Sequence, residues 1–151
     1  MKNLFDATVA NQVQARLRKL EPQSERRWGK MTAAQMLAHC SVSMQWAVGD
    51  VVPEKGPLLV RLMGRLVKPL VFRNEDPLRK NSPTAKSLVV TDERDLGKER
   101  ERLSGLIDRF VAGGAAGCTK HPHSFFGKMT PEEWAILMYR HLDHHLRQFG
   151  V

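Results

Sequence analysis

The sequence predicts an all-α protein, a four-helix bundle with a long, partly helical connection between the second and third helices. Four segments repeat apolar residues at steps of three and four, the spacing that gathers side chains on one helix face. Three of these segments open on a recognisable N-terminal cap. The only short candidate for a β-strand is Ser87–Thr91. Four amphipathic helices in one chain most simply bury their apolar faces together, so residues 1–151 are expected to form one domain.

The first two helices have clear boundaries in the sequence. The first is expected from about Phe5 to Leu20, with Asp6 as its N-cap, and it ends before Pro22 because the residue preceding a proline avoids helical geometry. The second begins at the capping-box pattern Thr32–Gln35 and continues to about Val48. Its sequence has no charged residue, which predicts a helix that is buried on most sides.

The third and fourth helices follow after long connections. The third is expected from about Asp92 to Val111, where two consecutive glycines stop it. The fourth starts at Thr130–Glu133, which combines an N-cap threonine, a proline in the first turn and a capping-box glutamate, and it runs to about Phe149. The connection before the third helix contains a short amphipathic segment, Leu58–Val71.

Composition narrows the class of protein. With 42% hydrophobic and 26% charged residues, the chain has the balance of an ordinary soluble domain. No signal peptide or transmembrane segment is evident, and two cysteines far apart suggest no disulfide framework, so a cytoplasmic protein is expected. The net charge of +8 is concentrated between residues 55 and 86, where Glu75 and Asp76 are the only acidic residues. The basic residues of this stretch are Lys55, Arg61, Arg65, Lys68, Arg73, Arg79, Lys80 and Lys86.

Histidines near the C-terminus suggest a metal site. His141 and His145 are four residues apart and extend the apolar face that Trp134 and Met138 begin, so both are expected to point inward. Two imidazoles at this spacing can bind one metal ion from a single helix. His144 falls at the edge of that face.

His39 on the second helix is the candidate third ligand. It shares a column with Gln35 and Ser43, at steps of four residues, and the alternative is that these three side chains form a buried polar seam without a metal. His121 and His123 lie in the loop before the fourth helix, where they could cover the site or add a ligand.

Two motifs resemble those of the DinB-like superfamily, a group of bacterial metal-binding four-helix-bundle proteins. Within that superfamily the chain is most similar to an uncharacterised branch. Met36–His39 resembles the ligand-bearing second helix of that superfamily. His141–Gln148 resembles its terminal pattern of His, two residues, His-His, two residues and Gln, although Leu146–Arg147 replaces the Arg-Gly of many relatives. The order of the helices also agrees.

The resemblance implies a role for each residue of these motifs. His39, His141 and His145 would bind one divalent metal ion, His144 would be a neighbour that does not bind it, and Gln148 would support the ligands from outside. Zinc is the first expectation, with nickel or iron as alternatives. Three neutral ligands leave open positions on the ion, which is typical of catalytic sites.

The resemblance also implies a reaction class, because members of the superfamily include thiol-dependent transferases and isomerases. A low-molecular-weight thiol is therefore an expected cofactor, and a small molecule the expected substrate. An acidic thiol would suit the basic side chains of Arg61, Arg65 and Arg73 if they border the site. The Glu of His-Glu-x-x-His metalloproteases is absent between the ligands, which argues against a hydrolase of that type.

A different function is open for the basic stretch. The segment within residues 55–86 is both basic and amphipathic, so the chain could instead be a non-enzymatic binding module for nucleic acid, an anionic membrane or a partner protein. Its apolar face could also form a homodimer, or cover one end of the bundle with its charges in water. Binding to DNA that weakens steeply with salt would favour the nucleic-acid version of this alternative.

Overall fold

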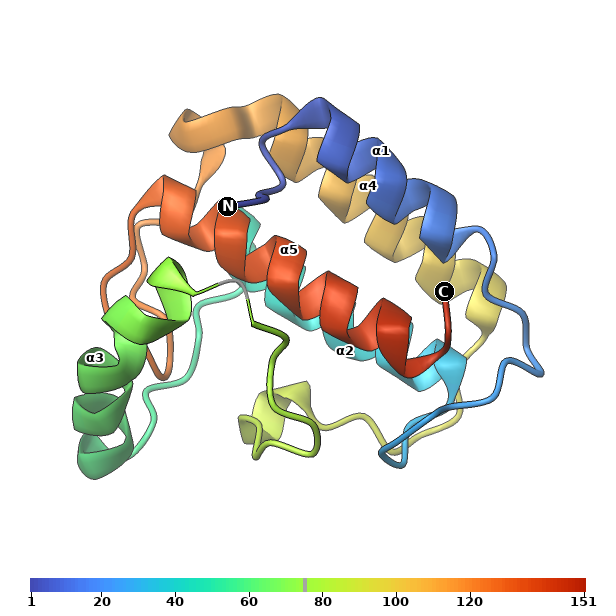
Figure 1. The fold of residues 1–151 in the computed structure, drawn as a ribbon, viewed down its shortest axis with the longest axis horizontal. Coiled ribbons are helices and arrows are strands. Elements are labelled where there is room, and N and C mark those ends of the chain that lie inside the picture. The colour runs from blue at the N-terminus through green and yellow to red at the C-terminus, as the bar shows by residue number, and fades with distance from the viewer. Residues whose placement is uncertain (75) are drawn as a thin grey trace.

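The computed structural model describes residues 1–74 and 76–151, and within them the fold is all-helical (Figure 1). Glu75, which entered the charge balance above, lies outside the described residues. Their only β-type pairing is one isolated bridge between His123 and Gly127. The α-helices are α1 (Ala7–Leu17), α2 (Ala33–Val48), α3 (Leu58–Arg73), α4 (Leu96–Gly113) and α5 (Pro131–Gln148), and the short 3-10 turns are η1 (Lys86–Leu88) and η2 (Gly114–Gly117).

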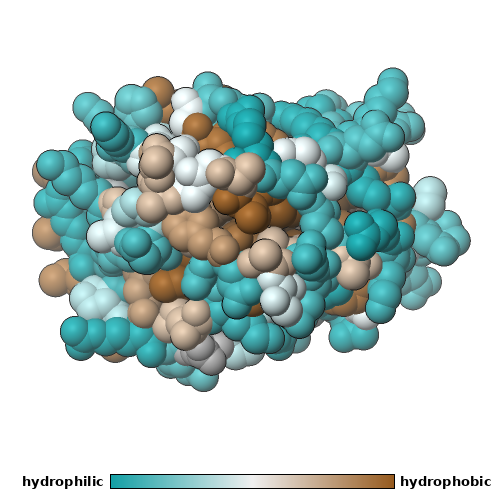
Figure 2. All heavy atoms as spheres, turned by 90° about the horizontal axis from the view of Figure 1, so that it is seen from above, coloured by the Kyte–Doolittle hydropathy of each residue, from teal (hydrophilic) through white to brown (hydrophobic). Residues whose placement is uncertain are grey.

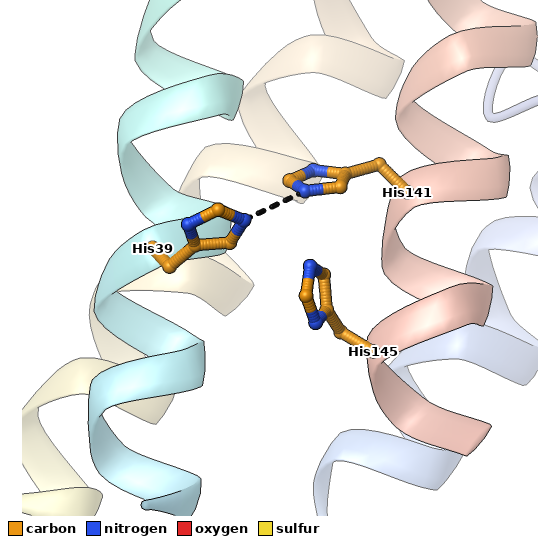
Figure 3. Close-up of side chains that lie close together, drawn as sticks. All are labelled: His39, His141 and His145. Atoms are coloured by element: carbon orange, nitrogen blue, oxygen red, sulfur yellow. Dashed lines mark hydrogen bonds between the residues drawn. The ribbon is translucent and has the colours of Figure 1, made fainter. Parts of the chain in front are cut away.

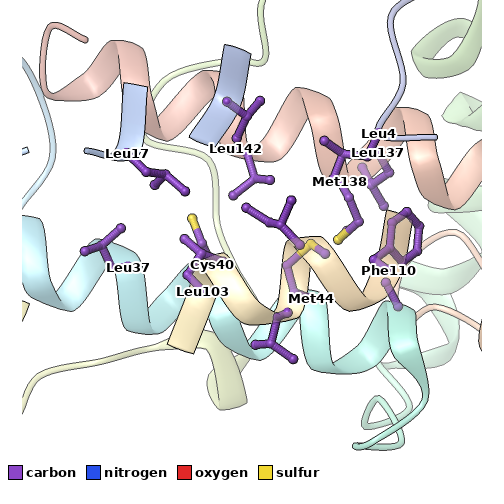
Figure 4. Packing of buried hydrophobic residues seen from close by; sticks show 14 of the residues in the cluster. Leu4, Leu17, Leu37, Cys40, Met44, Leu103, Phe110, Leu137, Met138 and Leu142 are labelled. Carbon is purple, nitrogen blue, oxygen red and sulfur yellow. The ribbon is translucent and has the colours of Figure 1, made fainter. Parts of the chain in front are cut away.

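The all-α prediction is confirmed, but a four-helix bundle is not, because the described residues contain five α-helices. The amphipathic segment of the long connection forms α3, a helix of 16 residues that is as long as α2. The other four helices share one hydrophobic core, with α2 packed most extensively on α4 (Figure 4). Core side chains from all four helices include Leu17, Leu37, Met44, Leu103 and Leu142.

The predicted caps set most of the helix ends. Asp6 accepts a hydrogen bond from the Thr8 amide at 2.8 Å, and capping boxes form at Thr32 and Thr130. The third predicted helix begins later than expected, because Asp95 rather than Asp92 caps α4 and accepts from the Lys98 amide at 2.8 Å.

The strand candidate Ser87–Thr91 is wrong. Residues Lys86–Leu88 form the turn η1, and no described strand lies beside it to complete a ladder. Leu88 is buried against α2, which brings its carbonyl group into the interior.

Helix α3 stands apart from the shared core (Figure 1). Gly64 is its only buried residue, and it approaches the main chain of the loop before α5 so closely that a Cβ there would lie 2.1 Å from the Phe125 carbonyl oxygen. Val67, Val71 and Phe72 pack against the core from the same side. The opposite side of α3 faces outward with its apolar side chains exposed.

Hydrophilic side chains cover most of the face seen from above, and apolar atoms show near its middle (Figure 2). Among the described residues, no helix combines the length and the apolarity that crossing a bilayer requires.

Candidate metal centre

The three histidines predicted as ligands meet between α2 and α5 (Figure 3). One ligand nitrogen from each of His39, His141 and His145 lies within 4.8 Å of the others, a spacing that could hold one metal ion. His39 on α2 contacts the rings of His141 and His145 on α5. Ser43, one turn further along α2, contacts His141. The two helices therefore run antiparallel here, and three ligands come from two rigid elements.

A main-chain carbonyl orients the first ring. His39 Nδ1 lies 2.7 Å from the Leu88 carbonyl oxygen. A carbonyl can only accept, so the neutral ring of His39 carries its proton on Nδ1 and leaves the Nε2 lone pair free.

A serine orients the second ring. His141 Nδ1 lies 2.9 Å from Ser43 Oγ, whose own hydrogen is donated to the Cys40 carbonyl oxygen at 2.8 Å. The hydroxyl oxygen is thereby left to accept from His141 Nδ1–H. His141 consequently has the same tautomer as His39.

The third ring is oriented through Gln148. The side-chain amide nitrogen of Gln148 donates to the Trp28 carbonyl oxygen at 2.7 Å. This bond turns Gln148 Oε1 toward the ring of His145, where it lies 2.8 Å from Nδ1. His145 therefore also carries its proton on Nδ1. All three Nε2 atoms present lone pairs, which is the form that metal-binding imidazoles need.

The short distance between two of these nitrogen atoms supports a cation at the centre of the three histidines. His39 Nε2 and His141 Nε2 are 2.9 Å apart, the contact dashed in Figure 3. Both protons are already used on Nδ1, so a hydrogen bond here would require a charged ring. Without a proton or a metal ion between them, the two lone pairs repel each other.

Burial keeps these rings uncharged. Burial, with a smaller contribution from neighbouring histidines, lowers the pKa of His145 to about 3 and holds the pKa of His141 well below its ordinary value. The pKa of His39 is lowered by burial as well, against a smaller raising effect of the Leu88 carbonyl. Neutral imidazoles at physiological pH are ready to bind a metal ion without first losing a proton.

A cavity of about 770 Å³ contains all three histidines. The segment from Leu78 to Thr91 supplies much of its wall, and Val71, Phe126 and Leu137 add apolar surface. Among the described lining residues the charged side chains are Lys30 and Arg79, and none is a carboxylate. The site thus offers metal ligands and cations, without an acidic group that could serve as a general base.

A family model described as "Protein of unknown function (DUF1569)" matches residues 2–150. The chain belongs to the DUF1569 family. No match was found among curated proteins or among solved structures. The description of the DUF1569 family names no reaction, so the function has to be argued from the site.

Several other predicted residues of this DUF1569 protein supply no ligand nitrogen to the triad. His144 packs against Trp28 and His145 and takes no part in the triad. His121 is exposed, and neither it nor His123 lines the cavity. The cavity is also not lined by the three arginines of α3, which are Arg61, Arg65 and Arg73. Its charged lining side chains among the described residues are Lys30 and Arg79.

The two cysteines do not add to the metal site. Burial raises the pKa of the Cys40 thiol strongly, and burial together with Glu132 raises the pKa of Cys118 to about 11. Both remain protonated at neutral pH, so neither is an activated nucleophile.

Gln148 orients His145, in the supporting role that the resemblance implied, but the sequence did not reveal the other residues that orient the ligands. Leu88 and Trp28 act through main-chain carbonyl groups, for which a side-chain pattern carries no signal. Ser43 did carry one, because it lies one turn after His39, but that spacing equally suited a polar seam.

Replacing Ser43 tests the orienting hydrogen bonds directly. We expect Ser43→Ala to lower metal affinity about 10- to 100-fold, because it leaves His141 Nδ1–H without its acceptor. Ser41→Ala is the matched control, since Ser41 is buried on the same helix and donates only to the Leu37 carbonyl oxygen. Competition against a chromogenic chelator measures both affinities, and equal losses in the two variants would contradict the assignment.

Proposed function

We propose that this protein binds one divalent metal ion through His39, His141 and His145 and uses it to act on a small molecule in the adjoining cavity. The observation that carries the proposal is the common tautomer, because three separate acceptors direct three Nε2 lone pairs to one point. We propose zinc as the ion, with nickel and iron as the alternatives that metal analysis distinguishes. Three neutral ligands leave its double charge uncompensated and its remaining positions open.

The proposed reaction is thiol-linked transfer or isomerisation, in keeping with the resemblance to DinB-like proteins. When bound, a divalent ion at this site supplies Lewis acidity that favours the deprotonated form of a thiol. The chain itself orients the ligand rings and places apolar side chains such as Val71, Phe126 and Leu137 in the cavity wall beside them. The absence of a carboxylate among the described lining residues argues against hydrolysis with a carboxylate base.

The charges near the site favour an acidic thiol. Lys30 and Arg79 line the cavity, and a neighbouring cavity of about 570 Å³ shares Trp28 and His144 with it. That second cavity has more cationic than anionic side chains: Lys2, Arg27, Lys80, Arg140 and Arg147 against Asp76 and Asp143. Such an excess attracts negatively charged molecules.

Cobalt substitution tests metal and thiol together. We expect the cobalt-loaded protein to develop a sulfur-to-metal charge-transfer band when glutathione, an acidic thiol, is added, because the open positions accept a thiolate. S-methylglutathione is the control, since it keeps the carboxylates but cannot form a thiolate. Failure to bind cobalt would overturn the metal proposal, whereas a cobalt spectrum that glutathione leaves unchanged would overturn the thiol-linked reaction alone.

The alternative function, a binding module formed by the basic amphipathic segment, is favoured by one observation. Helix α3 packs on the body through Val67, Val71 and Phe72 but leaves its larger set of apolar side chains exposed. This surface is independent of the metal centre.

A further inference from the structure

Helix α3 carries the most exposed apolar surface among the described residues. Six large side chains on it are each more than half exposed, and Leu58 reaches 79%. They lie at steps of three and four and therefore share one face. These residues, called here the outer face of α3, are Leu58, Leu59, Leu62, Met63, Leu66 and Leu70.

The inner side of α3 explains why this face stays exposed. The close approach of Gly64 to the Phe125 main chain, and the packing of Val67 and Val71, turn that side toward the body. Lys68 reinforces the arrangement through an ion pair with Glu133 at 2.7 Å. With its inner side held in this way, α3 cannot turn the outer face toward the core without breaking these contacts.

The charged side chains on the same helix as the outer face are all positively charged. Helix α3 contains Arg61, Arg65, Lys68 and Arg73 and no acidic residue. Arg65 is exposed at the edge of the face, half-buried Arg61 lies one turn earlier on the same edge, and Arg73 follows at the helix end. Within residues 1–74 and 76–151, no carboxylate forms an ion pair with any of these three arginines.

We propose that the outer face of α3 binds an anionic lipid surface, with the helix lying in the plane of the membrane. The leucines would enter the boundary between headgroups and acyl chains, and the arginines would reach the lipid phosphates. The leucines and the arginines both contact lipid in this arrangement. Membrane binding would be a second activity, separate from that of the metal centre.

Two other partners use only part of this surface. A second copy of the chain on the same face would bring the arginines of two α3 helices together, with no carboxylate on either helix to pair with them. A nucleic acid would satisfy the arginines but leave the leucines in water. An anionic bilayer matches the charge and the apolarity at once.

Flotation with lipid vesicles tests the proposal on the full chain. We expect binding to vesicles of phosphatidylglycerol and phosphatidylcholine in equal parts, and none to phosphatidylcholine alone. Leu62→Gln with Leu66→Gln should weaken binding about 100-fold, because two exposed leucines no longer enter the bilayer. Arg61→Gln with Arg65→Gln should weaken it about 30-fold, through loss of two cations near the lipid surface.

Arg18→Gln with Lys19→Gln is the matched control, because it removes the same charge from exposed positions after α1. It should bind the anionic vesicles nearly as well as the unmodified protein. Circular dichroism and metal content, which should be unchanged in every variant, exclude unfolding as the cause of a loss.

Three outcomes would overturn the proposal. The first is equal binding to neutral and anionic vesicles, or no binding to either. The second is a loss in the Arg18–Lys19 variant as large as that in the Arg61–Arg65 variant, which would indicate attraction by net charge alone. The third is a lipid-free dimer in sedimentation experiments that the two leucine substitutions abolish, which would show that a second copy covers this face.

Discussion

His145→Ala is expected to abolish metal binding at micromolar metal concentrations, while His144→Ala leaves it intact. Loss of an orienting hydrogen bond already lowers metal affinity about 10- to 100-fold, so loss of a ligand should cost more than about 100-fold. The two histidines are adjacent on α5, but only His145 directs a nitrogen at His39 and His141. His144 instead packs against Trp28, and its ring forms a hydrogen bond with the main chain of Leu78.

Metal analysis of protein purified without a histidine tag measures this difference. The unmodified protein and His144→Ala should each contain one ion per chain, and His145→Ala should contain almost none after dialysis. His145→Gln, which keeps more of the side-chain volume, separates loss of the ligand from loss of packing in the buried position. Equal metal content in the His144 and His145 variants would contradict the assigned ligand set.

Acid is expected to destabilise the metal-free protein in the range from pH 6.5 down to about pH 4. Burial among Trp46, Trp134 and Phe126 lowers the pKa of His123 from 6.5 to about 4. Between these two values the unfolded chain binds a proton that the folded chain does not, so stability is lost as the pH falls. At pH 5 the loss from His123 is about 2 kcal/mol, and it levels off below pH 4. The buried ligand histidines, whose pKa values are also lowered, change stability in the same direction when no metal is bound.

His123→Asn isolates this contribution. His123 Nδ1 accepts hydrogen bonds from the amides of Phe125 and Phe126 at 3.1 and 3.2 Å, and an asparagine oxygen can accept them without titrating. Urea unfolding in the presence of a chelator, at several values between pH 7.5 and 5, should show a smaller loss of stability with acid in the variant. The same dependence on pH in both proteins would contradict a neutral buried His123, whatever their absolute stabilities.

The helices could be predicted well where their signals are local. The capping boxes at Thr32 and Thr130 depend on residues three positions apart, and both form as the sequence indicates. The start of α4 was placed too early, near Asp92, because the sequence around it does not show that Asp95 caps the helix in the folded chain. The strand candidate Ser87–Thr91, which showed no convincing alternation, failed because the described residues offer no strand for it to pair with.

The place of α3 could not be predicted from its own pattern. Its periodicity indicates an amphipathic helix, but such a pattern does not say whether the apolar side meets the core. The close approach of Gly64 to the Phe125 main chain decides that, and it joins segments about sixty positions apart in the sequence. The arginines of α3 accordingly do not line the cavity, whose charged lining side chains among the described residues are Lys30 and Arg79.

By itself the sequence determined an all-α chain, the helix caps Asp6, Thr32 and Thr130, and two inward histidines one turn apart on the last helix. These features depend on neighbours within one or two helical turns, whose geometry is nearly the same in every protein. Only the tertiary structure decided that His39 meets that pair, since this depends on how α2 and α5 are aligned. It also decided that Leu88 and Trp28 orient the rings through main-chain carbonyl groups, which every residue possesses and which no sequence pattern can single out.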